Sequence, residues 1–546
     1  MKNTKALLTL LILPIFFIFL SNLFTDIYSP YYLNYHHDPS YVYLLNFLNL
    51  ATGHFAGHVE HPGTPLHVIG AVVIKIYHVF FGKADITTDV ITRPEIYLRA
   101  VNFAVLMLNA AVLYLLGLNI YRIYRNIYAG IFMQLCPFVS INIFMQFSDV
   151  NSESFIAVPV MLMLIYAFRY IDLNASDGKE DMKFILIFSV ITGLGICTKI
   201  ILFPLILIPL LLFNNYKQKL ILIFLSGVSF FIFFIPGIVE YRYFLEWIGK
   251  LFFKSGMYGG GEEGILNPAK FISNLQTIIL TEKLFALVIF ITLIFLIFSF
   301  FTFRRSAKEG VVLFINSDKY FRLLTGLFSA VSAGTLMIAK HYVSRYMISY
   351  LMLTIPVLFL MIYISYNTDS FNFKSLKVSL NTIFVSLIII IIVLNFRKYL
   401  FTYEDNITEK NNSMIIHDIL RNDHSNDILI SGHMEINQGT ALHFGTSFTG
   451  RMNVIYKKEL SRFYPHQIIF NYIHDQIFKL SRDTDLEEML NSGKRIVFLS
   501  DKYNSPESLI AKIKNDYGFT YASYDLIYKD PYDLNEVNLY EIKLKK

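Results

Sequence analysis

The chain has 546 residues, of which 55% are hydrophobic, 16% are aromatic and only 16% are charged. Soluble globular domains usually carry about a quarter charged residues. This composition therefore excludes an ordinary soluble enzyme and indicates a protein that crosses a membrane many times, surrounded by membrane lipids. The net charge of +6 is explained by basic residues in short loops beside the spans, which orient such proteins in the bilayer. No nucleic-acid partner is needed to explain it.

Apolar stretches long enough to cross a bilayer, about 17 to 25 residues, recur from the N-terminus to residue 395. Residues 1–24 lack a small-residue cleavage site, so we expect an uncleaved first span and not a signal peptide. About eleven spans are predicted, at residues 6–24, 97–120, 127–146, 154–170, 184–199, 201–213, 219–239, 284–303, 321–339, 346–365 and 377–395. Of these, 184–199 and 201–213 form a tight hairpin that need not cross completely.

Basic residues predict the orientation of these spans. If the N-terminal lysines are cytoplasmic, alternation of the predicted spans places five further basic loops on the same side, as the positive-inside rule requires. The loops around Asp38 and Asp149 and everything after Arg397 then lie on the outer side. Counting the apolar stretch 66–82 as a span would invert every later loop. We therefore expect that stretch to be a half-buried interfacial helix.

The composition changes after Arg397. From residue 401 the chain is polar and alternates short apolar strands with helical stretches, the pattern of an α/β domain long enough for its own core. Strands are expected at 428–430 and 495–500, and helices at 461–481 and 505–516. No phosphate-binding loop of the G-x-x-x-x-G-K-[ST] type occurs, which disfavours a nucleotide cofactor.

The predicted fold class is a mostly α polytopic membrane protein with about eleven transmembrane helices and a C-terminal extracytoplasmic α/β domain. The transmembrane part, with interfacial helices in its first outer loop, is expected to cover residues 1–396. The soluble domain is expected to cover residues 397–546.

Three carboxylates on the outer side are candidates for acid and base chemistry. Asp38 precedes an aromatic amphipathic run and could act as a general base on an acceptor hydroxyl or amine. An aspartate followed by proline is also a common helix N-cap. Asp149 and Glu153 form a second acidic pair at a helix entrance, where acidic residues ordinarily complement the helix dipole.

A second group of candidates combines histidines with a carboxylate in the first outer loop. His54, His58, Glu60 and His61 offer nitrogen and oxygen donors that suit a divalent cation such as zinc. Their spacing is not diagnostic, and single histidines in interfacial loops usually form only hydrogen bonds. Glu60 and His61 are the predicted metal ligands if a metal is bound.

Cationic residues at the outer boundary form the third group of candidates. Lys199 lies between two apolar runs. A charge at membrane depth is energetically costly, which suggests that this lysine has a function. The alternative is that its long side chain only extends to the polar surface of the membrane. Lys340, His341 and Arg345, beside Tyr346, form a cationic patch in which arginine could pair with a phosphate. These cations are predicted on the outer side of the membrane, opposite the basic loops, so the positive-inside rule does not explain them.

In their order along the chain, these motifs resemble the membrane glycosyltransferases of the GT-C superfamily, especially the branch of lipid A aminoarabinose transferases and protein O-mannosyltransferases. The resemblance covers about residues 1–395. Its motifs are Asp38-Pro39-Ser40-Tyr41, Gly63-Thr64-Pro65-Leu66, Leu98-Arg99-Ala100, the stretch 193–199 ending in Thr198-Lys199, and Arg345-Tyr346. The chain departs from the family at Pro39, where relatives have glutamate, and at Gly63-Thr64-Pro65, where they have two prolines.

The resemblance implies that a sugar passes from a polyprenyl-phosphate carrier to a lipid, glycan or protein acceptor, with an inverting mechanism. The site would lie on the extracytoplasmic face of a bacterial plasma membrane and serve glycosylation in the cell envelope. Asp38 would be the base, Lys199 and Arg345 would bind the carrier phosphate, and Glu60 and His61 stand near where some relatives hold a metal. A lipid-phosphate leaving group requires cations and an opposing carboxylate, but no nucleotide.

Two other functions stay open at the level of sequence. A lipid or solute transporter could line its pathway with the same charges, although no repeated halves are visible in the sequence. An oligosaccharide ligase or polymerase would use the same kind of lipid carrier but move a preassembled glycan.

Overall fold

The computed structural model describes residues 2–545, except 34–36, 174–177, 257–259, 307–318, 368–378, 425–426, 433–436, 466, 472–475, 480–485, 501–503 and 530–536. The chain divides into two compact units, and each is described by itself. Unit 1 comprises Met1–Leu23, Val59–Leu66 and Phe103–Leu400, and unit 2 comprises Phe24–His58, His67–Asn102 and Phe401–Lys546. The predicted domain division after residue 396 stays a prediction.

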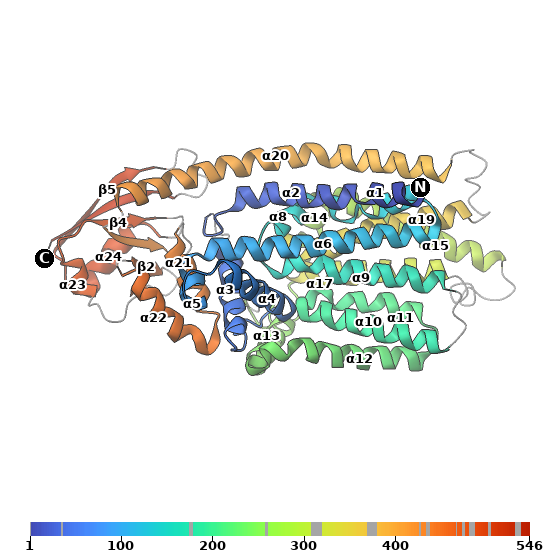
Figure 1. The fold of residues 1–546 in the computed structure, drawn as a ribbon, viewed down its shortest axis with the longest axis horizontal. Helices are drawn as coiled ribbons and strands as arrows, with labels where there is room; N and C mark the ends of the chain where they lie inside the picture. Colours follow the sequence, from blue (N-terminus) through green and yellow to red (C-terminus); the bar gives the residue numbers. More distant parts are fainter. Residues whose placement is uncertain are drawn as a thin grey trace. The chain divides into compact units, whose positions relative to one another are not determined.

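Most described residues are helical. The helices with residues in unit 1 are α1 (Lys2–Leu10), α2 (Ile12–Tyr28), α4 (Thr64–Phe81), α6 (Pro94–Tyr124), α7 (Ile127–Met133), η1 (Cys136–Phe138), α8 (Ile141–Phe147), α9 (Ser152–Asp172), α10 (Gly178–Thr198), η2 (Ile200–Ile206), α11 (Leu207–Leu212), α12 (Tyr216–Phe234), η3 (Ile235–Glu240), α13 (Tyr241–Phe253), α14 (Pro268–Thr281), α15 (Lys283–Ser306), α17 (Lys319–Lys340), η5 (Ser344–Met347), α18 (Ile348–Met352), α19 (Thr354–Asn367) and α20 (Leu380–Asp423). Within unit 1, α10 packs between α9 and α12, and these three helices run side by side in Figure 1.

The helices confirm a polytopic membrane protein. In the described part of the chain, nine helices are long and apolar enough to cross a membrane, or ten if the pair α14 and α15, bent by 104°, forms one span. Many of their large apolar side chains are exposed, as on α12 at Ile223, Phe224, Phe231 and Ile232. In a soluble protein such faces would be an aggregation hazard, whereas lipid covers them in a membrane.

One predicted span is wrong, a second is too short to count as a span, as its prediction allowed, and one interfacial prediction is not confirmed. Residues 127–146 are divided into α7, η1 and α8, because Pro137 and the capping Ser140 interrupt the helix. Residues 201–213 form η2 and α11, which together make an apolar helical segment shorter than the spans. The stretch predicted as interfacial at 66–82 forms α4, which by length and composition alone could cross a membrane.

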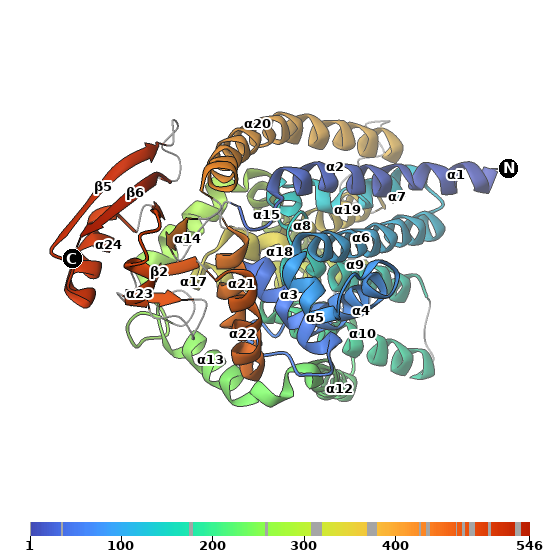
Figure 2. The same cartoon turned by 60° about the vertical axis from the view of Figure 1, so that its left-hand side comes forward.

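Unit 2 contains a mixed sheet. Its elements are α3 (His37–Ala51), α5 (Ile86–Thr92), β1 (Ile428–Gly432), α21 (Gln438–Thr446), η8 (Gly450–Met452), α22 (Asn453–Phe463), β2 (Gln467–Asn471), β3 (Gln476–Lys479), α23 (Leu486–Leu490), β4 (Ile496–Leu499), α24 (Pro506–Tyr517), β5 (Tyr521–Tyr528) and β6 (Leu539–Lys545). The described strands have the order β3-β2-β1-β4-β6-β5. β1 pairs in parallel with β2 and β4, and the remaining pairs are antiparallel. Figure 2 shows the long antiparallel pair of β5 and β6.

The sheet and its helices confirm the predicted α/β character of the C-terminal part, and the core of the sheet explains why the sequence revealed it. Alternate residues of the parallel strands, such as Ile430, Ile468 and Phe498, are buried on one face together with Leu509 and Ile513 of α24. Strands that are buried on both sides appear in a sequence as short continuous apolar runs.

The same property explains an error in the C-terminal prediction. The helix predicted at 461–481 is wrong, because 467–471 and 476–479 form strands β2 and β3 and only its first residues belong to α22. A short apolar run cannot be assigned to a helix or a strand by its periodicity alone. Here, pairing of Ile468 with Ile430 and of Phe470 with Gly432 in the parallel register decides for a strand.

Candidate functional site

A buried cluster of opposite charges lies in unit 1. Glu153 accepts a hydrogen bond from the Nζ of Lys199, and the Nε of Arg345 lies 3.3 Å from the same oxygen, Oε1. The side chains of Glu153 and Lys199 are only 3% and 2% exposed, whereas that of Arg345 is 26% exposed. Two cations face one carboxylate, so these three side chains carry one net positive charge.

The local backbone explains how Lys199 enters the interior. Its N–H still donates to the carbonyl of Gly195 at 2.9 Å, as in a helix. Its own φ and ψ, −160° and 131°, are extended, and the chain continues as the tighter helix η2. The lysine therefore stands at a break between two helical segments. The sequence predicts a charge at membrane depth here, and the side chain is buried. Its function stays a prediction, and the contact with Glu153 was not foreseen from the sequence.

Glu153 lies in the first turn of α9, where its neighbours fix the helix start. Asn151 is the N-cap residue and accepts from the N–H of Ser154 at 2.9 Å. The hydroxyl of Ser152 donates to Oε2 of Glu153 at 2.8 Å. One carboxylate oxygen thus contacts the cations and the other a neutral donor, which holds the side chain in one orientation.

Tyr346 joins this cluster to a neighbouring cavity. The Nζ of Lys199 lies 4.4 Å from the centre of the Tyr346 ring, within the range of a cation–π contact. The same ring lines a cavity of about 140 Å³. The walls of this cavity are mainly apolar and come from the segments η2, α13 and α17 and from the residues before η5: Ile200, Ile201, Trp247, Ile248, Leu251, Phe252, Met337, Ile338 and Val343.

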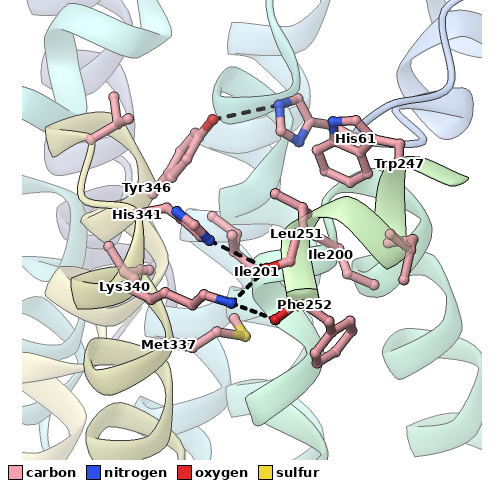
Figure 3. A pocket seen from close by; sticks show the side chains of 13 residues that line it. His61, Ile200, Ile201, Trp247, Leu251, Phe252, Met337, Lys340, His341 and Tyr346 are labelled. Carbon is pink, nitrogen blue, oxygen red and sulfur yellow. Dashed lines mark hydrogen bonds between the residues drawn. The ribbon is translucent and has the colours of Figure 1, made fainter. Parts of the chain in front are cut away.

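Figure 3 shows the polar residues at the edge of this cavity. The Nζ of Lys340 donates to the carbonyl oxygens of Leu251 and Phe252, at 2.7 and 2.8 Å, and a ring nitrogen of His341 lies 3.3 Å from the Leu251 oxygen. Both residues thus satisfy carbonyl groups at the C-terminal end of α13. Burial lowers the pKa of His341 from its ordinary value, which favours the neutral ring near pH 7.

The two predicted metal ligands have separate partners. Glu60 accepts a hydrogen bond from the hydroxyl of Tyr243. The ring of His61 packs edge-on against Trp247, with 4.8 Å between the ring centres, and its Nε2 lies 3.5 Å from the Tyr346 hydroxyl. Among the described residues, no group of three or more His, Cys, Asp or Glu side chains is placed to hold a metal ion. The metal stays a prediction, and no step below uses one.

Asp149 is buried just before the start of α9. Its Oδ1 accepts from the N–H of Val150 at 2.9 Å, and its Oδ2 lies 3.5 Å from the amide of Asn151. These local contacts agree with the second interpretation of Asp149, in which it stabilises the start of α9 and takes no part in catalysis.

Asp38 belongs to unit 2, whereas the three residues of the charged cluster belong to unit 1. It is exposed, and its backbone is not helical (φ −102°, ψ 105°), so regular helix begins at Pro39. This is the backbone position of an N-cap residue. Asp38 lies in the loop between Tyr31 and Tyr41, and one carboxylate holds both ends of that loop. Glu95 accepts from the N–H of Tyr31 at 2.8 Å and from the hydroxyl of Tyr41 at 2.7 Å.

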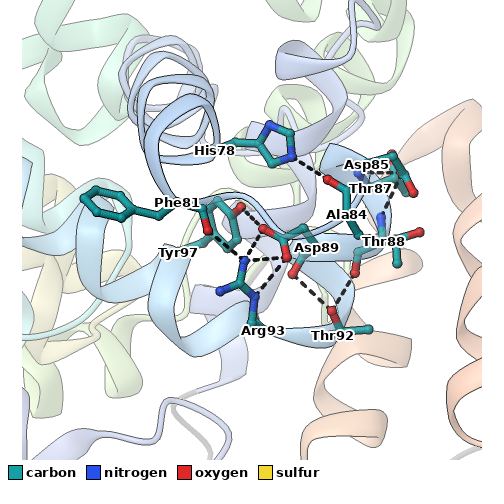
Figure 4. A network of polar contacts seen from close by, with 10 residues as sticks. All are labelled: His78, Phe81, Ala84, Asp85, Thr87, Thr88, Asp89, Thr92, Arg93 and Tyr97. Carbon is teal, nitrogen blue, oxygen red and sulfur yellow. Dashed lines mark hydrogen bonds and ion pairs between the residues drawn. The ribbon is translucent and has the colours of Figure 1, made fainter.

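Figure 4 shows a second network of polar contacts, which joins α5 to the start of α6. Glu95 lies in the first turn of α6. Asp85 caps α5, and Asp89 forms an ion pair with Arg93 and accepts a hydrogen bond from Tyr97. Burial acts to raise the pKa of Asp89, but the hydrogen bonds from Arg93 and Tyr97 outweigh it and lower the pKa. The ionised carboxylate therefore ties α5 to the first turns of α6.

The C-terminal part of unit 2 contacts the helix after Asp38. The side-chain amides of Asn46 and Asn49 donate to the carbonyl oxygens of Phe448 and Thr449, at 3.2 and 3.1 Å. A Cβ atom on Gly445 would lie 2.7 Å from the carbonyl oxygen of Tyr41, so only glycine permits this approach of α21 to α3. Residues after 437 thus support the segment that carries the predicted base.

Sequence reasoning missed Glu95 and Trp247. Trp247 is the only tryptophan of the chain and lies on the amphipathic α13. A single tryptophan in an amphipathic helix could have indicated an interfacial or binding role from the sequence. Glu95 follows Pro94 at a helix start, where a carboxylate needs no further explanation. Only the contacts with Tyr31 and Tyr41 distinguish it.

Neither known protein-family models nor curated proteins include a match to this chain. Among solved structures, the chain is similar to the crystal structure of ArnT from Cupriavidus metallidurans bound to undecaprenyl phosphate. The two chains are 11% identical, the alignment covers 92% of each, and the TM-score is 0.45.

Proposed function

We propose that this protein is a membrane glycosyltransferase that moves a sugar from a polyprenyl-phosphate carrier to an acceptor on the extracytoplasmic face. The observation that carries the proposal is the buried, net positive cluster of Glu153, Lys199 and Arg345 beside an apolar cavity. The positive charge of the cluster suits a phosphate group, and the apolar cavity suits a prenyl chain. The sequence resemblance to GT-C enzymes, set out above, points the same way.

The cluster has the chemistry of a phosphate site. Lysine supplies a compact charge, whereas arginine can form two parallel hydrogen bonds to phosphate oxygens. Arg345 is the most exposed member of the cluster, so an incoming phosphate can reach its guanidinium group. Tyr346 contacts Lys199 on one side and the apolar cavity on the other. A phosphate at the cations would therefore have space for the first part of its lipid chain nearby.

The proposed reaction is a single displacement at the anomeric carbon. An acceptor hydroxyl or amine attacks that carbon, its proton passes to a base, and the bond between the carbon and the phosphate oxygen breaks. Lys199 and Arg345 stabilise the negative charge that develops on the departing polyprenyl phosphate. Asp38 is assigned as the base because of the sequence resemblance. Lys340 and His341 are assigned to the wall of the lipid cavity.

One observation favours a second candidate, a transporter. Helices α14 and α15 meet at an angle of 104°, and the buried Glu282 at the break accepts from Ser140 and Asn142 at 3.0 and 2.7 Å. Broken helices with a buried carboxylate are common at transporter binding sites. The two candidates differ in a measurable way: a glycosyltransferase releases free polyprenyl phosphate when sugar and acceptor are supplied, whereas a transporter leaves the carrier intact.

A cryo-EM structure of the whole protein with a polyprenyl-phosphate sugar tests the proposal. We expect the phosphate within hydrogen-bond distance of Lys199 and Arg345 and the prenyl chain beside Tyr346. Density for the phosphate elsewhere would contradict the assignment of the site. Intact carrier after prolonged incubation of the reconstituted protein with a range of acceptors would favour the transporter.

A further inference from the structure

The cluster contains a carboxylate that a simple phosphate site would not need. If Lys199 and Arg345 serve only to attract phosphate, Glu153 opposes them, because its Oε1 contacts both cations and its side chain is nearly fully buried. A buried carboxylate is costly unless paired. Its presence needs an explanation beyond the binding of an anion.

The charges of donor and product supply that explanation. In a polyprenyl-phosphate sugar the phosphate is a diester with one negative charge. After transfer, the released polyprenyl phosphate is a monoester, which carries about −1.5 to −2 charges near pH 7. The cluster, with one net positive charge, becomes neutral when the diester binds. With the product it becomes negative, and the extra charge lies close to Glu153.

We propose that Glu153 matches the phosphate site to a singly charged phosphodiester and against a doubly charged phosphomonoester. This inference rests on the proposed function and specifies its substrate class. In this role Glu153 does not touch the reacting atoms; it sets the charge that Lys199 and Arg345 present. During turnover, formation of the monoester places a second negative charge beside a buried carboxylate, and the repulsion speeds release of the product.

The proposal predicts a change in selectivity. The probes are farnesyl phosphate, a monoester, and its methyl ester, a diester, each titrated into the whole protein in nanodiscs at pH 7. The quantity measured is the ratio of the monoester Kd to the diester Kd. Glu153→Gln should lower this ratio by about tenfold or more, because one unit charge a few ångströms away in an effective dielectric constant near 20 corresponds to at least that change in affinity.

Matched variants separate charge from packing. Glu153→Asp keeps the charge and should leave the ratio near the wild-type value. Arg345→Gln removes one positive charge and should raise the ratio, the opposite direction from Glu153→Gln. Glu180→Gln removes the charge of another glutamate of unit 1, which pairs with Lys183 at the start of α10, the end opposite Lys199. It should leave the ratio unchanged.

The outcomes are distinguishable. A lower ratio in Glu153→Gln together with a wild-type ratio in Glu153→Asp supports the proposal. If both probes bind the wild type but Glu153→Gln leaves the ratio unchanged, the role of Glu153 is refuted and the proposed function survives. If Glu153→Gln does not fold, the double variant Lys199→Met with Glu153→Gln is compared with Lys199→Met alone: a lower ratio in the double variant supports the proposal, and an equal or higher ratio overturns it. If neither probe binds the wild type, the proposed function and this inference both fail.

Discussion

Two glutamates at the starts of long helices have opposite surroundings. Glu153, in the first turn of α9 in unit 1, contacts two cations and the hydroxyl of its neighbour Ser152. Glu95, in the first turn of α6, lies in unit 2 and accepts from a backbone N–H and a tyrosine hydroxyl. At the level of sequence both look like ordinary complements of a helix dipole. The role of a carboxylate therefore depends on the side chains and backbone groups it contacts, and not on its position in the helix.

The partners also decide what removal of each carboxylate should cost. Loss of one member of a buried ion pair leaves an uncompensated charge, which typically costs about 3 to 5 kcal/mol. Loss of a hydrogen-bond acceptor for neutral donors costs about 1 to 3 kcal/mol. The Glu153 site should therefore govern the binding of charged ligands, and the Glu95 site should govern the order of the loop that carries Asp38.

The largest expected effect concerns that loop. Asp38→Asn should lower sugar transfer by about 10²- to 10⁴-fold, the usual contribution of a general base, because asparagine can still cap a helix but cannot take a proton. Expression, stability and binding of the polyprenyl-phosphate donor should be nearly unchanged. The measurement is release of polyprenyl phosphate by reconstituted protein.

The control for this prediction is Asp85→Asn, at an N-cap of the same unit whose carboxylate accepts from Thr87 and Thr88. It should transfer sugar like the wild type. Wild-type turnover in Asp38→Asn would remove Asp38 from the mechanism and move attention to Asp149 or Glu153.

The second prediction tests the charged side of the comparison. Lys199→Met should weaken donor binding and lower the free energy of unfolding by about 3 kcal/mol or more, because Glu153 is left with Arg345 alone. The double variant Lys199→Met with Glu153→Gln should recover most of the stability but not the donor binding. Detergent melting curves and donor titrations measure the two quantities. Equal stability of the single and double variants would show that the two side chains are not coupled.

The third prediction tests the neutral side. Glu95→Ala should cost about 1 to 3 kcal/mol and speed hydrogen exchange in peptides that cover residues 29–45, because both ends of the loop lose the same acceptor. Tyr41→Phe removes only one of the two bonds and should give a smaller effect in the same peptides. Unchanged exchange in Glu95→Ala would mean that Glu95 does not order the loop.

The last prediction concerns the orientation of the chain, which determines the side of the membrane that each glutamate faces. Ser492→Cys, at an exposed position between α23 and β4, should react with an impermeant thiol reagent added from outside. Asn214→Cys, exposed before α12, should not. The reverse pattern would indicate that the parity assigned from the basic loops is wrong, with a crossing by α4 as the first explanation to examine.

Much of the fold could be predicted because its information is local. Hydropathy over about 20 residues defines a span, and it located most of the helices that could cross a membrane. It failed where a helix breaker stands inside an apolar stretch, at Pro137, and where a short apolar run could belong to a helix or a strand, at 467–471. The candidate cations Lys199 and Arg345 could also be found, because a charge among apolar residues is conspicuous in a sequence.

Local sequence patterns thus specified the class of the protein, the main helices, the α/β character of its C-terminal part and the two candidate cations. Only the packing of distant segments shows that Lys199 and Arg345 meet Glu153 and that Glu95 contacts Tyr31 and Tyr41. Glu153 and Lys199 are separated by 46 positions, and Tyr41 and Glu95 by 54. Such pairs form only when helices pack in one particular register, and packing depends on side chains from several segments at once, which no local pattern records.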